Sequence, residues 1–93
     1  AMPHFRTGVI VMLQRPILDV QGNTVEQALH AIGFEMMHNV RIGKYIELEL
    51  EAESAQRARQ LVEDACRQLL ANPVIEEYHI ARLEEVPTPE LSP

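Results

Sequence analysis

The chain has 93 residues, a length that favours one domain with a small hydrophobic core. Its 14 acidic and 8 basic residues give a net charge of −6, which argues against nucleic acid as a partner. We expect neither a membrane span nor export, because the chain has no run of about 18 apolar residues and no secretory signal pattern. Its single cysteine, Cys66, cannot form an internal disulfide, and this fits a reducing cytoplasm.

The first predicted elements are a strand and a short helix. Residues 5–13 form the strand, and both of its faces are largely apolar, which is typical of a central strand. A turn-rich connection over residues 16–22 follows. Asn23 with Glu26 then fits a capping box at the start of the helix. The apolar residues of this helix recur at helical spacing, and Gly33 is placed to end it.

Residues 39–50 are the most unusual segment, because their two halves follow different patterns. Ile46, Leu48 and Leu50 alternate with glutamates, which predicts a half-buried strand with an acidic outer face. The first half contains Gly43, which weakens a strand and indicates a bulge, a bend or the close approach of another group. The segment is therefore expected to be one long strand or two pieces joined at Gly43.

A second helix and a last strand complete the predicted elements. Ser54 is placed to cap the helix, and an apolar stripe runs along residues 55–70. The pair Asn72-Pro73 is expected to end this helix. Residues 74–83 are predicted to be the last strand.

The expected fold class is α+β, with elements in the order strand, helix, strand, helix, strand. We expect a small antiparallel sheet of three strands, or four if the long second strand is bent, with both helices on one face. A single domain would cover residues 1–86, and prolines mark residues 87–93 as a tail. The other sheet face would expose Ile10 and Met12 unless a second chain covers them, so self-association is expected.

Residue types used in catalysis are present, but their arrangement does not predict an active site. We interpret the glutamates of residues 47–51 as a solvated strand face, because their environments are alike. Cys66 lies on the apolar stripe of the second helix and is expected to be a buried, unreactive thiol. We therefore expect no catalytic, cofactor-binding or metal-binding residue on this chain. The histidines lack metal-ligand spacing and are interpreted as ordinary surface or hydrogen-bonded side chains: His4, His30, His38 and His79.

Three charged residues each have two interpretations. Asp19 could accept backbone hydrogen bonds within its own turn, or it could anchor a partner chain. Arg41 and Lys44 could be solvent-facing cations that protect a strand edge. They could instead dock an acidic group of a partner.

Three segments stand out when they are taken in order and spacing. They are Leu18-Asp19-Val20-Gln21-Gly22 with the helix start at residues 25–29, Asn39-Val40-Arg41-Ile42-Gly43-Lys44-Tyr45, and Leu69-Leu70-Ala71-Asn72-Pro73-Val74-Ile75-Glu76. Together they resemble the PurS family, the small subunits of phosphoribosylformylglycinamidine synthase. The second segment is the most specific, and the resemblance covers residues 4–86. One departure is Val20, where the family often has proline.

The resemblance implies a role in the assembly of a purine-biosynthesis complex rather than catalysis by this chain. In that complex, a large synthetase subunit (PurL) uses ATP and Mg²⁺, and a glutaminase subunit (PurQ) releases ammonia. PurS joins the two and supports the transfer of ammonia. The chain would hold no cofactor itself and would form a dimer or a dimer of dimers. The motif residues carried over, with interface or turn roles, are Asp19, Gly22, Arg41, Gly43, Lys44 and Asn72.

Two other classes of function are alternatives. One is a dimeric ferredoxin-like regulatory module that binds a small ligand, such as an amino acid, between two protomers. Such a module needs a pocket with convergent polar groups. The other is a stand-alone enzyme, for which the residues offer no constellation.

Overall fold

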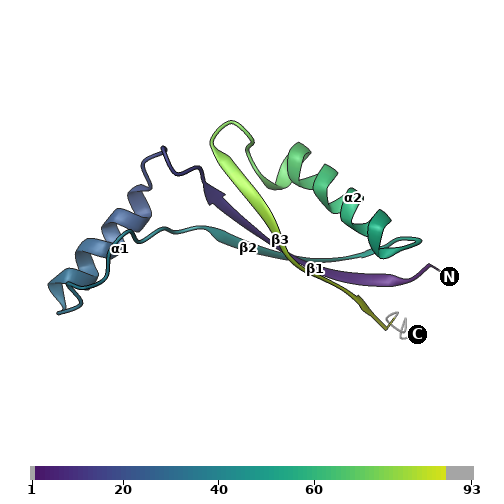
Figure 1. Ribbon diagram of the computed structural model, residues 1–93, viewed down its shortest axis with the longest axis horizontal. Coiled ribbons are helices and arrows are strands. Elements are labelled where there is room, and N and C mark those ends of the chain that lie inside the picture. The colour runs from purple at the N-terminus through teal and green to yellow at the C-terminus, as the bar shows by residue number, and fades with distance from the viewer. Residues whose placement is uncertain (1, 88–93) are drawn as a thin grey trace, which may run out of the picture.

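A computed structural model describes residues 2–87 as a three-stranded antiparallel sheet with one helix packed on it and one helix projecting from its end (Figure 1). The strand order is β2-β1-β3, so the first strand is central, as predicted. The α+β class and the alternating element order are confirmed, with three strands rather than four. The elements are β1 (His4–Leu13), α1 (Val20–Ala31), β2 (Lys44–Glu51), α2 (Ala55–Ala65), the π-helical segment η1 (Cys66–Leu70) and β3 (Glu76–Val86).

The hydrophobic core lies between the sheet and α2. Alternate residues of β1 point to the α2 side, which is the period of two expected for a strand. Thr7, the polar member, donates its hydroxyl to the carbonyl oxygen of Arg82 at 2.8 Å, so its burial leaves no unpaired donor. The buried side chains of β1, α2 and η1 are Phe5, Thr7, Val9, Val11, Ala58, Val62 and Cys66.

Cys66 is a free thiol in this core, as predicted. Burial raises its pKa, and the neighbouring charge of Glu63 acts in the same direction. A thiol with a raised pKa is protonated at neutral pH and is a poor nucleophile.

The opposite face of the sheet carries no helix within residues 2–87, which also agrees with the prediction (Figure 1). Ile10 is 36% exposed there, and Tyr45 is 52% exposed. Met12, which shares this face by strand alternation, is half-buried, and the face also carries charged side chains. Glu49 on β2 pairs with His4 at 2.9 Å and with Arg6 at 3.2 Å, and these two hydrogen bonds lower the pKa of Glu49.

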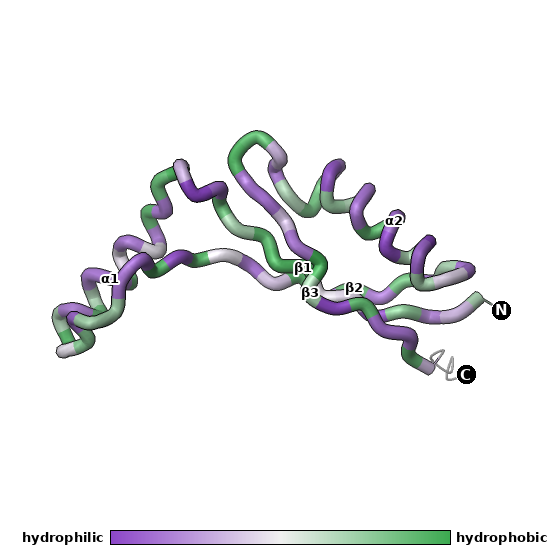
Figure 2. Tube along the Cα trace, viewed as in Figure 1, coloured by the Kyte–Doolittle hydropathy of each residue, from purple (hydrophilic) through white to green (hydrophobic). Residues whose placement is uncertain are grey.

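The prediction that both helices cover one face of the sheet is wrong for α1. This helix lies beyond the end of the sheet and hardly contacts the strands (Figure 1). The radius of gyration is 17.5 Å, against about 12 Å for a compact domain of this length. Hydrophobic turns of α1 therefore have no sheet beneath them (Figure 2). We call residues 14–43, which carry α1, the arm, and residues 2–13 with 44–87 the body.

The start of α1 also differs from the prediction. Asp19 is the N-cap and Val20 the first helical residue, so Asn23 does not cap the helix. Glu26, which was expected to complete a capping box, instead accepts a hydrogen bond from the backbone N–H of Val40 at 3.0 Å. Both differences have one cause, because each carboxylate bonds to a segment that returns from the far end of the helix.

Residues 39–43, which we call the returning segment, were predicted to be strand but do not join the sheet. Their backbone bonds to carboxylates of the arm, so it is not free for a β ladder. The end of the helix agrees with the prediction. Gly33 follows it, and the N–H of Phe34 donates to the carbonyl of Leu29 at 2.9 Å in a Schellman-type cap.

The second half of the chain follows the predictions more closely. Ser54 caps α2 and accepts from the N–H of Arg57 at 3.1 Å. The helical segment ends at Leu70, before Asn72-Pro73, and β3 runs slightly later than expected. The predicted tail lies outside the described residues from residue 88 onward, so the division into a domain and a tail stays a prediction. Within residues 2–87, no helix has the length and apolar character needed to cross a bilayer.

Candidate functional site

Most of the motif residues meet at the base of the arm, where Asp19 is central. Its Oδ1 accepts the N–H of Gly22 at 2.8 Å, and its Oδ2 accepts the N–H of Ile42 at 2.7 Å. The first bond caps α1, and the second ties the helix to the returning segment. These two bonds, with the charge of Arg41 nearby, hold the pKa of Asp19 below its usual value. Because both carboxylate oxygens are engaged, the geometry favours the turn interpretation of Asp19 over an anchor for a partner.

Two glycines allow the close contacts at this base. A Cβ at Gly22 would lie 2.3 Å from the carbonyl oxygen of Val40, so only glycine lets the first turn of α1 approach the returning segment. A Cβ at Gly43 would lie 2.1 Å from the Sδ of Met12 and 2.6 Å from the carbonyl oxygen of Val11. At each glycine a neighbouring atom belongs to the backbone, so it cannot easily move aside for a larger residue.

The two motif cations have different environments. The guanidinium of Arg41 donates to the carbonyl oxygen of Leu13, the last residue of β1, and so clamps the returning segment to the body. Lys44 begins β2 and is exposed. Among the hydrogen bonds and ion pairs of residues 2–87, none involves its side chain. Lys44 is therefore available to an acidic group of another molecule, whereas Arg41 has an internal partner.

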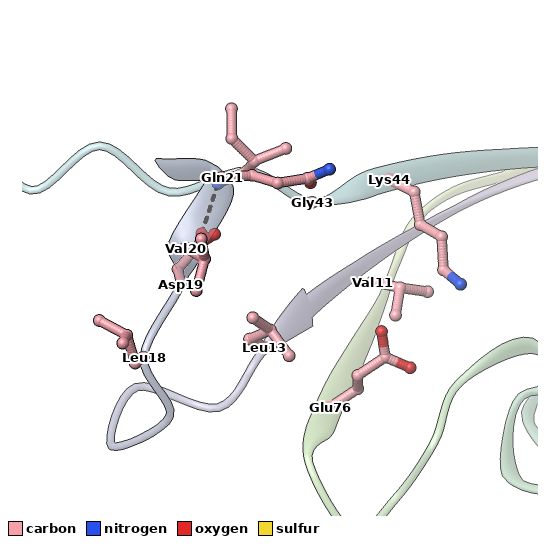
Figure 3. A pocket seen from close by; sticks show the side chains of 10 residues that line it. Val11, Leu13, Leu18, Asp19, Val20, Gln21, Gly43, Lys44 and Glu76 are labelled. Atoms are coloured by element: carbon pink, nitrogen blue, oxygen red, sulfur yellow. Dashed lines mark hydrogen bonds between the residues drawn. The ribbon is translucent and has the colours of Figure 1, made fainter. Parts of the chain in front are cut away.

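An open cleft of about 380 Å³ separates the start of α1 from the sheet. Leu18, Asp19 and Val20 line its α1 side, and Lys44 and Glu76 lie on its sheet side (Figure 3). The lining is mixed, because apolar side chains share it with the opposite charges of Lys44 and Glu76. Such a cleft can receive a segment of a partner that presents both apolar and charged groups.

Asn72 lies outside this cleft, in the loop between η1 and β3. Its Oδ1 accepts the N–H of Val74 at 3.1 Å, and its own N–H donates to a carboxylate oxygen of Glu76 at 2.7 Å. The first bond is an Asx turn. The second holds the carboxylate of Glu76, which lines the cleft, so Asn72 acts on the cleft only through that residue.

Sequence reasoning missed the apolar surface of the arm. Leu18, Val20, Ile32 and Met36 are between 65% and 75% exposed. The available signal was their position in the sequence. The apolar face predicted for the first helix covers residues 25–32, and these four residues lie outside it or at its end. An uncovered apolar surface of this kind marks an interaction site. Sequence reasoning also missed Glu76, because nothing in its local pattern reveals that it faces the start of α1.

Fold and site together define a small α+β interaction subunit. Its polar motif side chains hold the arm in place, and the arm exposes apolar surface. A family model described as PurS: Phosphoribosylformylglycinamidine (FGAM) synthase matches residues 6–84. The phosphoribosylformylglycinamidine synthase subunit PurS of Bacillus subtilis is 43% identical over 82 residues, which are 88% of this chain and 95% of that protein. The chain therefore belongs to the PurS family, as its three segments indicated.

Solved structures agree with this family in sequence and in shape. The purS subunit of phosphoribosylformylglycinamidine synthase from Thermotoga maritima has a TM-score of 0.79 at 35% identity, covering 92% of this chain and 95% of that one. A chain in the structure of PurLQS from the same organism has a TM-score of 0.78 at 36% identity, covering 91% of this chain and 100% of that one. These relatives therefore share the fold of this chain over nearly their whole length.

Proposed function

We propose that this chain is a non-catalytic assembly subunit of the phosphoribosylformylglycinamidine synthase complex. It bridges the glutaminase and the ATP-dependent synthetase and supports the transfer of ammonia between them. The observation that carries this proposal is that the motif side chains hold the fold of their own chain together. Asp19, Arg41 and Asn72 all bond to backbone groups of their own chain, whereas the arm offers its surface to other chains.

A second copy of this chain is the first proposed partner. The apolar surface of the arm and the open sheet face both lack a cover within residues 2–87. Covering them removes apolar area from water, which drives association. A dimer or a dimer of dimers satisfies both surfaces. A relative with this fold is part of the PurLQS structure, which supports assembly with the two larger subunits as well.

The large synthetase subunit PurL and the glutaminase subunit PurQ are the other proposed partners. Lys44 and Glu76, which line the cleft, supply opposite charges that can fix the orientation of a partner segment. The complex as a whole is a carbon–nitrogen ligase with glutamine as amido donor. Its ATP and Mg²⁺ belong to the other subunits in this proposal, as do the active sites.

The cytoplasm is the proposed location. Cys66 is a free thiol with a raised pKa, a state that a reducing compartment maintains. Fractionation of cells that express the chain without a tag tests this location. Recovery with a membrane or secreted fraction would contradict it.

Reconstitution of the complex tests the bridging role. The two larger subunits are assayed with and without this chain, once with glutamine and once with ammonium as the nitrogen source. We expect omission of the chain to abolish synthesis from glutamine and to leave synthesis from ammonia in place. Loss of both activities, or of neither, contradicts a bridging role.

Charge introduced on the arm tests the proposed self-association surface. Leu18→Asp places a carboxylate on the arm, and Leu69→Asp places one on the body as a matched control. Both leucines are more than 70% exposed, at 75% and 83%, so neither change should unfold the chain. We expect Leu18→Asp alone to shift sedimentation velocity towards smaller species. A shift with Leu69→Asp alone would indicate that the self-association surface lies on the body.

One observation favours the regulatory alternative. Lys44 and Glu76 lie on one side of the cleft, and such a pair of charges can bind the carboxylate and the amino group of an amino acid. Asp19 adds nothing to this site, because both of its oxygens are engaged. Titration of free amino acids into the isolated chain separates the two functions, since specific micromolar binding would favour the regulatory module.

A further inference from the structure

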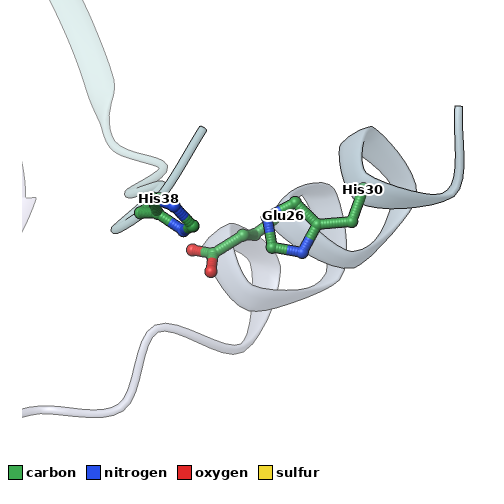
Figure 4. A group of neighbouring side chains, drawn as sticks. All are labelled: Glu26, His30 and His38. Atoms are coloured by element: carbon green, nitrogen blue, oxygen red, sulfur yellow. The ribbon is translucent and has the colours of Figure 1, made fainter. Parts of the chain in front are cut away.

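On the arm, apart from the site at its base, three side chains with metal-binding chemistry converge (Figure 4). One carboxylate oxygen of Glu26 and one imidazole nitrogen each of His30 and His38 lie within 4.8 Å of one another. From this geometry we propose a binding site for a divalent transition-metal cation of the Zn²⁺ class. This proposal does not rest on the assembly function.

The backbone brings these three groups together in two ways. Glu26 and His30 are four residues apart on α1, so they lie on the same face of the helix. His38 comes from the connection that follows the helix and folds back beside it, so that its ring meets the ring of His30 edge to face at 5.7 Å. A turn in this connection, in which the N–H of Met37 donates to the carbonyl of Phe34 at 3.1 Å, precedes His38.

Backbone hydrogen bonds already orient two of the three ligands. One carboxylate oxygen of Glu26 accepts the N–H of Val40 at 3.0 Å. The Nε2 of His30 lies 2.7 Å from the carbonyl oxygen of Met37. A carbonyl oxygen only accepts, so this nitrogen carries the proton of that bond. An ion on Nδ1 would leave this bond in place, and the carbonyl of Met37 would then set the ring orientation, as in known metal-binding histidines.

The ligand types decide the class of cation. Two imidazoles and a carboxylate bind Zn²⁺ and leave a fourth position for water or another group. Ca²⁺ and Mg²⁺ prefer sets made of oxygen ligands. Tetrahedral Zn²⁺ with bonds of about 2.1 Å needs ligand atoms about 3.4 Å apart, so the three groups must move slightly closer. His38 is exposed and lies outside the helix, which gives it the freedom to do so.

The sequence did not predict this site, because only Glu26 and His30 have a helical spacing and two ligands alone do not indicate a metal. His38 reaches them through the path of the chain after the helix. A bound ion would join α1 to that connection. It would therefore stiffen the arm that carries the apolar surface.

Calorimetric titration of ZnCl₂ into the full chain, free of any added histidines, tests the proposal at pH 7.5. We expect one ion per chain, with binding at least about tenfold weaker in His38→Gln. His79→Gln, a change of another exposed histidine on β3, is the matched control and should bind like the unaltered chain.

Thermal unfolding supplies an independent readout. Zn²⁺ should raise the unfolding midpoint of the unaltered chain and of His79→Gln but not that of His38→Gln. His38 is exposed, so its replacement should leave the metal-free midpoint unchanged, which circular dichroism checks. MgCl₂ should give neither heat nor a shift of the midpoint. Absence of binding up to millimolar Zn²⁺, or equal binding by His38→Gln, overturns the proposal.

Discussion

The body and the arm are built by different forces. The body encloses a core between α2 and the sheet, where Val9, Val62 and Cys66 are at most 2% exposed. The arm has no such core, and Gly22 is its one buried helical residue in α1. Hydrogen bonds of Asp19, Glu26 and Arg41 to the backbone hold it in place.

This difference separates folding from association. The body can be stable on its own, because apolar burial is the dominant favourable term in folding. The arm leaves apolar residues in water, so it gains its full stabilisation only when another chain covers them. Substitutions in the two regions should therefore have different consequences for stability and for association.

The largest effect is expected in the core of the body. Val62→Ala removes two methyl groups from a side chain that is 2% exposed, so it should lower the free energy of unfolding by about 2–3 kcal/mol. Val25→Ala on α1, where the side chain is 39% exposed, is the control and should change it by less than about 0.5 kcal/mol. Urea unfolding of dilute protein measures both. Equal losses would mean that the arm has a core of its own.

The next effect is expected at the base of the arm. Gly22→Ala places a Cβ 2.3 Å from the backbone oxygen of Val40, and this clash should cost about 1–2 kcal/mol. Gly8→Ala is the control, because its Cβ would meet only the hydroxyl end of the Tyr45 side chain, which can move away. Hydrogen exchange at the N–H of Ile42 should become faster in Gly22→Ala alone. The close-contact account fails if the two variants behave alike.

A smaller, pH-dependent effect is expected from Asp19. Its pKa is lower in the folded chain than its ordinary value of 3.8. Its contribution to stability is therefore full above about pH 4 and is lost as the pH falls through the lower, folded pKa. Asp19→Ala should unfold more easily than the unaltered chain at neutral pH, and the two midpoints should converge in acid. Glu49, whose pKa is also lowered, acts in the same window.

The comparison of Asp19→Ala with Glu49→Gln separates these two carboxylates. Glu49 lies in the body and pairs with His4 and Arg6, so its replacement should leave the arm unchanged. Only Asp19→Ala should also accelerate hydrogen exchange at Ile42, because only Asp19 bonds to that amide. A difference between the midpoints that persists undiminished in acid would contradict the role given to the Asp19 carboxylate.

The smallest effect on stability is expected from Lys44→Glu. Lys44 is exposed and begins β2, so the free energy of unfolding should stay within about 0.5 kcal/mol. Association with the larger subunits should nevertheless weaken, since a charge at an interface is reversed. Arg41→Glu should impair both folding and association, because Arg41 clamps the arm through the Leu13 carbonyl. Unchanged association of Lys44→Glu would remove this residue from the interface.

Features that depend on near neighbours in the chain were predictable. The period of two in β1 and the apolar stripe of α2 identified the core, and Ser54 was recognised as a cap. Gly33 was placed correctly at the end of α1, because cap geometry involves only a few consecutive residues. Asn23 was predicted as the N-cap because Glu26 follows three residues later, as in a capping box, whereas Asp19 takes that position in the structure.

The bond that decides between these two caps is a long-range one. Asp19 reaches Ile42, which is 23 residues further along the chain, and it is this contact that makes Asp19 more than a turn residue. The same contact removes the returning segment from the sheet. The proximity of Glu26, His30 and His38 was not predicted for a related reason, because it depends on the path of the connection after α1.

The sequence by itself determined the α+β class, the order of the elements, the core of the body and, through three segments, the family. These follow from periodicity, capping and motif spacing, which are properties of neighbouring residues. Only the tertiary structure decided that α1 leaves the sheet as an arm, that Arg41 is held internally while Lys44 is exposed, and which carboxylates bond to the returning segment. The physical reason is that hydrogen bonds between distant segments set the direction of α1, and no periodicity along the chain records them.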